Sequence, residues 1–200
     1  MRVIGLTGGV GSGKTTVSRM LQELGAVLVD ADKIGHQSYL PDSPAWMDIV
    51  ATWGEGLLQP NREVDRRKLG AIVFGEPAAL AKLNSIVHPQ MRDMIRKQLA
   101  DLERTQVPTV VFEAAILIEA GWGSLADEIW TTDAPEETVV KRLKERNGWS
   151  EEQVRARINA QLPRSERLSY AQVIIDTDCS LEELRARVKA QWQERIASVE

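Results

Sequence analysis

The chain has 200 residues, of which 43% are apolar and 27% are charged, so a globular domain with a core of ordinary size is expected. Its formal net charge is −4, which excludes a global positive field that would favour nucleic acid or an anionic membrane surface. One cysteine, Cys179, leaves no intrachain disulfide or cysteine-based metal site. No apolar run approaches roughly 18 residues, so we expect no membrane span and a cytoplasmic protein.

The first part of the chain predicts a strand, a helix and a second strand. The apolar run 3–7 ends in glycines, a pattern typical of a buried strand followed by a tight turn. Residues 14–24 carry apolar side chains on one helical face, and Gly25 stands where such a helix would end. A second apolar run, 26–29, is followed by two aspartates. This order is that of a βαβ unit.

The segment 33–105 has helical patterns and no strand pattern. A helix is expected over 65–73, and Pro77 is suited to the first turn of the next one. We expect Pro89 to interrupt that helix before a further stripe of apolar residues at helical spacing. The segment is therefore predicted to be a helical insertion at one end of the sheet.

Strand and helix patterns alternate again after residue 105. Such alternation predicts a parallel sheet covered on both faces, with ligands bound beyond the carboxyl ends of the strands. The expected strands are 109–112, 128–132 and 173–175, and the expected helices cover 135–146, 151–162 and a final segment that begins at a Ser180–Glu183 capping box.

The turn after the first strand matches G-x-x-x-x-G-K-[ST] over residues 8–15. Glycines let the backbone fold around phosphate oxygens, and successive N–H groups at a helix N-terminus form an anion-binding nest. Lys14 would supply a positive charge to the outer phosphates, and the Thr15 hydroxyl can ligate Mg²⁺. The residues expected to hold a nucleotide are Gly9, Gly11, Ser12, Gly13, Lys14, Thr15 and Thr16.

Two carboxylates, Asp30 and Asp32, follow the second predicted strand. Because the carboxyl end of that strand is expected beside the phosphate loop, a carboxylate there could accept the proton of an attacking hydroxyl or organise Mg²⁺ through water. The alternative is that either residue only caps the following helix. Two acidic residues that flank one alanine at this place favour a functional role.

A phosphate loop alone does not define the reaction, because kinases, GTPases and ATP-driven machines share it. A nucleoside or nucleotide kinase would use arginines near an acceptor phosphate, and Arg62, Arg66 and Arg67 could have that role. A nucleotide-dependent switch or ATPase would need a water-positioning residue and an apolar strand that ends in Asp, whereas the strand after residue 108 ends in Glu113.

Further segments of the sequence resemble the dephospho-coenzyme A kinase family. The resemblance begins with GLTGGVGSGKTT and VLVDADKIGH. The family's helical CoA-side domain is similar to DRRKLGAIVF and LNSIVHP, its lid to RLKERNG and RINAQLP, and its terminal strand and helix to AQVIIDTDCSLEEL. These segments cover nearly the whole chain in the expected order.

The resemblance implies an α/β fold, the three-layer P-loop NTPase fold with a parallel sheet, an inserted helical substrate subdomain and a helical lid. The core would comprise 1–32 and 106–200, the insertion about 33–105 and the lid about 143–166. It also implies transfer of a phosphoryl group from ATP, with Mg²⁺, to the ribose 3′-hydroxyl of dephospho-CoA. That small molecule would be the partner of a monomer or weak homo-oligomer.

Residue roles follow from the same resemblance. Asp32 is the expected general base, and Lys14 neutralises charge on the transferred group. The substrate side would include Asp30, Arg66 and His88, although His88 is equally suited to packing. Several arginines crowd the lid, and Arg142 is the best match for a contact to the nucleotide phosphates; the alternative is a solvated helix face. These arginines are Arg142, Arg146, Arg155, Arg157 and Arg164.

Overall fold

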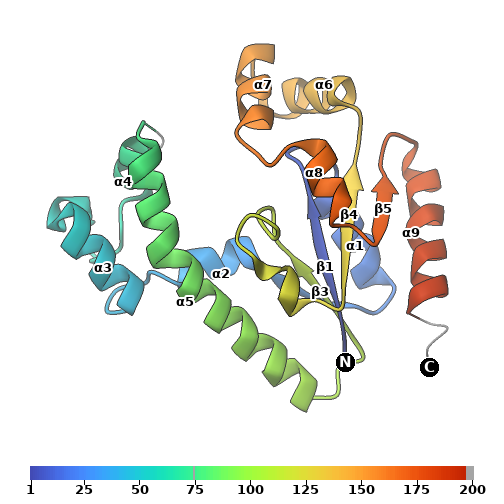
Figure 1. The fold of residues 1–200 in the computed structure, drawn as a ribbon, viewed down its shortest axis with the longest axis horizontal. Coiled ribbons are helices and arrows are strands. Elements are labelled where there is room, and N and C mark those ends of the chain that lie inside the picture. Colours follow the sequence, from blue (N-terminus) through green and yellow to red (C-terminus); the bar gives the residue numbers. More distant parts are fainter. Residues whose placement is uncertain (74, 197–200) are drawn as a thin grey trace. The chain divides into compact units, whose positions relative to one another are not determined.

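The structure is a computed structural model that describes residues 1–73 and 75–196. Within these residues the strands form one sheet in the order β2-β3-β1-β4-β5, and every neighbouring pair is parallel. The predicted α/β class with a parallel sheet is confirmed (Figure 1). The strands are β1 (Arg2–Gly8), β2 (Val27–Asp30), β3 (Thr109–Glu113), β4 (Glu128–Asp133) and β5 (Val173–Asp176).

Helices make up most of the remaining described chain. They are α1 (Lys14–Glu23), α2 (Ala31–Gln37), α3 (Pro44–Trp53), α4 (Arg66–Val73), α5 (Pro77–Arg104), α6 (Glu136–Asn147), α7 (Glu151–Asn159), α8 (Arg164–Ser169) and α9 (Leu181–Arg195), with short 3₁₀ helices η1 (Glu55–Leu57) and η2 (Trp122–Leu125). In the ranges 1–73 and 75–196, no helix is both long enough and apolar enough to cross a membrane.

The sheet core explains why the carboxyl ends of the strands are held in place. The helices α1 and α9 lie against each other and cover one face of the sheet. Leu6 of β1, Leu21 of α1 and Val188 of α9 are fully buried in this cluster. Each such side chain stabilises the fold by about 1.5–3 kcal/mol, so the loop that joins β1 to α1 is anchored at both ends.

The order of the strands separates β1 from β2. The two strands are parallel, as the βαβ pattern predicts, but β3 lies between them and pairs with both. Leu6, Glu113 and Asp30 therefore follow one another across the sheet in register. Glu113, and not Asp30, is the carboxylate on the strand next to the phosphate loop.

The chain divides into two compact units. The first, Met1–Asp30 with Asp101–Glu200, contains the sheet and the helices α1 and α6–α9. The second, Ala31–Ala100, contains α2, α3, α4 and most of α5. Its described strand-like pairing is one antiparallel bridge between Leu58 and Val64.

Two expected helix boundaries are wrong, and proline is involved in both. Pro89 does not interrupt α5, which continues to Arg104; burial of Val87 and Met91 on either side offsets the hydrogen bond that proline removes. The helix expected over 151–162 ends at Asn159, and α8 follows as a separate helix. Pro163 disfavours helical backbone at the residue before it, which explains the break.

Candidate active site

The phosphate loop has the backbone conformation that its glycines predict. β1 ends at Gly8 and α1 begins at Lys14. Gly11 and Gly13 have φ values of 73° and 88°, in the left-handed region that favours glycine. The carbonyl of Gly13 accepts the first helical hydrogen bonds, from the N–H groups of Thr16 (3.0 Å) and Val17 (3.1 Å). The N–H groups at the very start of α1 precede that ladder, so they suit an anion.

Lys14 lies beside a carboxylate that sequence reasoning treated only as a strand end. Its Nζ donates a hydrogen bond to Oε1 of Glu113 at 2.8 Å, and the two side chains are 14% and 10% exposed. Glu113 is the last residue of β3 and pairs in register with Asp30. Lys14, Glu113 and Asp30 thus lie at the same part of the sheet edge. The feature that could have indicated this contact from the sequence was an acidic residue at the end of a fully buried strand.

Ser12 supports the loop from within the protein. Its hydroxyl is 2.7 Å from Oγ1 of Thr132 at the end of β4, and its side chain is buried. Oγ1 of Thr177 donates to the carbonyl of Ser12 at 2.8 Å. A Cβ on Gly8 would lie 2.1 Å from Oγ1 of Thr132, so glycine is required there by close packing. The hydroxyl and the carbonyl of Ser12 are thus both used in holding the loop in place.

Arg142 lies close to the start of α1. Its Nη1 donates to Oγ1 of Thr177 at 3.0 Å, and its Nη2 donates to the Thr177 carbonyl at 2.6 Å. Arg142 and Thr177 line a cavity of about 550 Å³ together with Gly11, Gly13 and Thr16. The structure therefore brings Arg142 together with three residues that the phosphate-loop motif predicts as nucleotide contacts.

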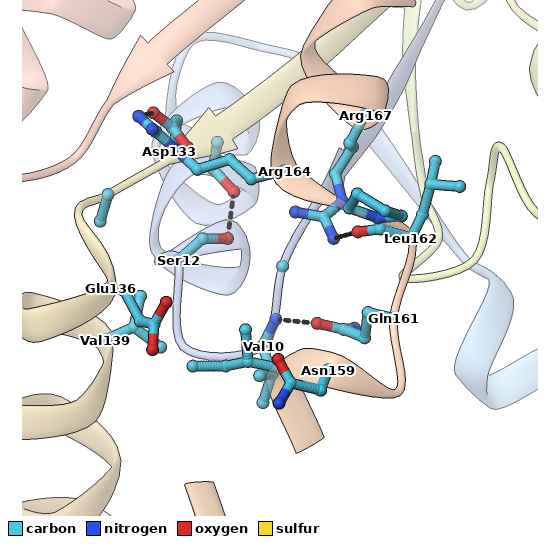
Figure 2. A pocket seen from close by; sticks show the side chains of 15 residues that line it. Val10, Ser12, Asp133, Glu136, Val139, Asn159, Gln161, Leu162, Arg164 and Arg167 are labelled. Atoms are coloured by element: carbon cyan, nitrogen blue, oxygen red, sulfur yellow. Dashed lines mark hydrogen bonds and ion pairs between the residues drawn. The ribbon is translucent and has the colours of Figure 1, made fainter. Parts of the chain in front are cut away.

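A second cavity, of about 310 Å³, borders the phosphate loop (Figure 2). Its walls are the first half of the phosphate loop, the end of β4 and the segment that joins α7 to α8. Oε1 of Gln161 accepts a hydrogen bond from the N–H group of Val10 at 2.8 Å, and Arg167 lies against Gly9. Sequence reasoning did not assign a role to Gln161 or Arg167; the available signal was a polar segment, QLPRSER, at the end of the predicted lid.

The other arginines of this region contact neighbouring side chains. Arg164 forms an ion pair with Asp133, whose hydrogen bond raises the pKa of the guanidinium. Arg155 forms ion pairs with Glu136 and Glu151. Arg157 lies over the ring of Trp149, with Cζ 3.9 Å from the centroid.

Three predicted substrate residues belong to the second compact unit. Asp32 is in the first turn of α2, Arg66 is the first residue of α4, and His88 lies within α5. His88 is partly buried, and this burial lowers its pKa.

The described residues contain no group of three or more His, Cys, Asp or Glu side chains that could hold a metal ion alone. Mg²⁺ usually binds through one or two protein groups together with substrate phosphates. The exposed Thr15 at the start of α1 fits this pattern, as do the carboxylates of Glu113 and Asp30 at the sheet edge.

A parallel sheet, a phosphate loop between its central strand and a helix, and a lysine paired with a carboxylate define a P-loop nucleotide-binding protein. A shikimate kinase from Acinetobacter baumannii shares the fold, with a TM-score of 0.53 at 18% identity over 99% of this chain and 94% of that one. This likeness concerns the fold alone.

Proteins with more similar sequences show the family to which this chain belongs. The sequence model described as Dephospho-CoA kinase matches residues 2–183. A dephospho-CoA kinase of Geobacter sulfurreducens is 43% identical over 98% of this chain and 100% of its own length. The structure of a dephospho-CoA kinase from Campylobacter jejuni covers 100% of both chains with a TM-score of 0.76 and 27% identity. A Thermus thermophilus structure reaches a TM-score of 0.81 at 32% identity, with 97% of each chain covered. The chain belongs to the dephospho-CoA kinase family.

Proposed function

We propose that this protein is a kinase that transfers the terminal phosphoryl group of ATP to the ribose 3′-hydroxyl of dephospho-CoA. The products are CoA and ADP, and the reaction is the last step of CoA synthesis. The observation that carries the proposal is the family match over residues 2–183, together with a fully formed phosphate loop in that range. Two relatives named dephospho-CoA kinase match this chain over 100% and 98% of their own length.

The phosphate loop binds the nucleotide. Amide N–H groups at the start of α1 donate hydrogen bonds to the phosphate oxygens. Lys14 exchanges its contact with Glu113 for one with the outer phosphates, which carry more negative charge. The cavity beside Gly13, Thr16 and Arg142 receives the rest of the nucleotide. Its position at the same end of α1 supports this assignment.

Asp32 accepts the proton of the attacking hydroxyl. Phosphoryl transfer of this kind passes through a loose transition state, so the proton can leave late and positioning matters more than the basicity of the carboxylate. Arg66 and His88, from the second compact unit, help to hold the acceptor molecule, dephospho-CoA. The family resemblance of the segments around them supports these roles.

Mg²⁺ accompanies ATP, and the Thr15 hydroxyl would be its ligand from α1, with Glu113 or Asp30 within reach through water. When bound, the ion neutralises charge on the phosphate oxygens. The protein's own contribution is to hold the triphosphate in one orientation and to keep Lys14 next to it.

The choice of acceptor tests the proposal. ATP is offered with dephospho-CoA, with AMP or with water alone, and formation of ADP is followed. Only dephospho-CoA is expected to stimulate the reaction; stimulation by AMP would favour a nucleotide kinase, and an unchanged rate in water would favour an ATPase. We further propose that the enzyme acts in the cytoplasm and on small molecules only.

A further inference from the structure

Gly9 occupies a position at which the phosphate-loop motif accepts any residue. Its backbone does not have the positive φ that favours glycine, unlike that of Gly11 and Gly13. A Cβ on Gly9 would instead lie 2.9 Å from Nη1 and 3.5 Å from Cζ of Arg167. The guanidinium of Arg167 therefore takes the space of a side chain at position 9.

The side chain of Arg167 is held in this place. The residue is 8% exposed, and its Nη2 donates to the carbonyl of Leu162 at 2.6 Å. Figure 2 shows the guanidinium directed from α8 toward the cavity beside the loop. Burial lowers the pKa of Arg167, and the charges of Glu119 and Asp133 oppose that change. Arginine remains protonated at neutral pH.

The carboxylates that line the cavity neutralise the charge of Arg167 less than they neutralise that of Arg164. The charged lining residues are Asp133, Glu136, Arg164 and Arg167. Asp133 forms its ion pair with Arg164, and Glu136 forms its ion pair with Arg155 outside the lining. Glu119, whose charge also acts on Arg167, lies outside the lining. A buried cation at a cavity whose lining carboxylates are paired with other arginines favours an anionic ligand.

We propose that this cavity receives a phosphate group of a substrate and that Arg167 binds it, with Gly9 lacking a side chain so that the guanidinium can reach the phosphate loop. A guanidinium matches phosphate oxygens in a fork of two parallel hydrogen bonds. This inference rests on the proposed function for the identity of the substrates. The group has two possible sources, the terminal phosphate of ATP and the diphosphate of dephospho-CoA.

The test compares Arg167→Met and Arg167→Lys with a control, Arg157→Met. Arg157 belongs to the neighbouring helix α7, lies over Trp149 and does not line the cavity. Calorimetry gives the affinities for ADP and for the imido analogue of ATP, and steady-state kinetics gives KM for dephospho-CoA. Thermal unfolding identifies variants that fail to fold, and Arg167→Lys keeps the charge if Arg167→Met does not fold.

If the nucleotide supplies the phosphate, Arg167→Met weakens binding of the ATP analogue roughly 10- to 100-fold more than binding of ADP. If the acceptor supplies it, KM for dephospho-CoA rises by a similar factor while both nucleotide affinities stay within about twofold of the control. Arg167→Lys should recover part of either loss. Equal changes for ADP and the analogue, with an unchanged KM, would overturn the inference and leave Arg167 a structural residue.

The two proposals fail separately. In Arg167→Met, the affinity for the ATP analogue relative to ADP is measured without an acceptor. A selective decrease can therefore be observed even if the wild-type protein does not phosphorylate dephospho-CoA. Conversely, normal phosphorylation of dephospho-CoA by Arg167→Met would leave the proposed function intact and remove the role of Arg167.

Discussion

The ammonium group of Lys14 donates a hydrogen bond to the carboxylate of Glu113, with Nζ 2.8 Å from Oε1. Lys14 starts α1 and Glu113 ends β3, so the pair joins the phosphate loop to the neighbouring strand. Both side chains are largely buried. Glu113 thus balances the charge of Lys14, which is proposed to contact the ATP phosphates during the reaction.

Glu113→Gln should destabilise the free protein by about 1–3 kcal/mol, because a largely buried ammonium loses its charged partner. Saturating ATP should reduce this loss, since phosphate oxygens then pair with Lys14. Chemical unfolding with and without ATP measures both values, with Glu103→Gln on the exposed surface as the control. A loss that is equal in the two conditions would show that Lys14 does not exchange partners.

Gly8→Ala should impair the loop, because its Cβ would lie 2.1 Å from Oγ1 of Thr132 and 2.5 Å from Oγ of Ser12. We expect a stability loss of about 1–3 kcal/mol and at least tenfold weaker ATP binding, measured by denaturant unfolding and calorimetry. Gly56→Ala is the matched control, because a Cβ there meets no atom within 4 Å. Unchanged ATP binding by Gly8→Ala would contradict the proposed need for close packing at Thr132.

Asp32→Asn should lower kcat roughly 10²- to 10⁴-fold, the usual effect of losing a general base. Its affinity for ATP should stay within about threefold of wild type, because the nucleotide is assigned to the phosphate loop. Single-turnover kinetics and ATP titration separate the two quantities. The exposed residue Asp48 of α3 provides a control variant, Asp48→Asn. A near-normal kcat for Asp32→Asn would exclude the general-base role.

His88 should make the protein less stable as the pH falls. Burial lowers its pKa in the folded state, so below about pH 6.5, the ordinary value, the unfolded chain binds more protons than the folded chain. The free energy of unfolding therefore decreases as the pH falls from this value toward the folded pKa. In His88→Gln that decrease should be smaller over pH 7.5 to 5.5. Identical pH slopes for the two proteins would mean that another group causes the change.

The sequence predicted those features that depend on residues close together in the chain. The phosphate loop follows from glycines and a lysine within eight positions, and Ser180 forms with Glu183 the capping box that their spacing predicts. Both kinds of feature are local, because one turn of backbone brings the partners together.

Features that depend on strand order could not be predicted in the same way. The place of Glu113 next to Lys14 requires β3 to lie between β1 and β2, and no pattern near either residue encodes that order. The contacts of Gln161 and Arg167 with the loop join residues about 150 positions apart. Their detection needs the path of the chain from α7 to α8, whereas the sequence predicted one helix over 151–162 in place of α7 and did not predict α8.

The most direct measurement combines the purified protein with ATP, Mg²⁺ and dephospho-CoA, and follows ADP and the acceptor product by mass spectrometry and ³¹P NMR. We expect one CoA for each ADP, with the new phosphate on the ribose 3′ oxygen and almost no product from Lys14→Ala. ADP that forms at the same rate without dephospho-CoA, or with AMP in its place, would contradict the proposed function.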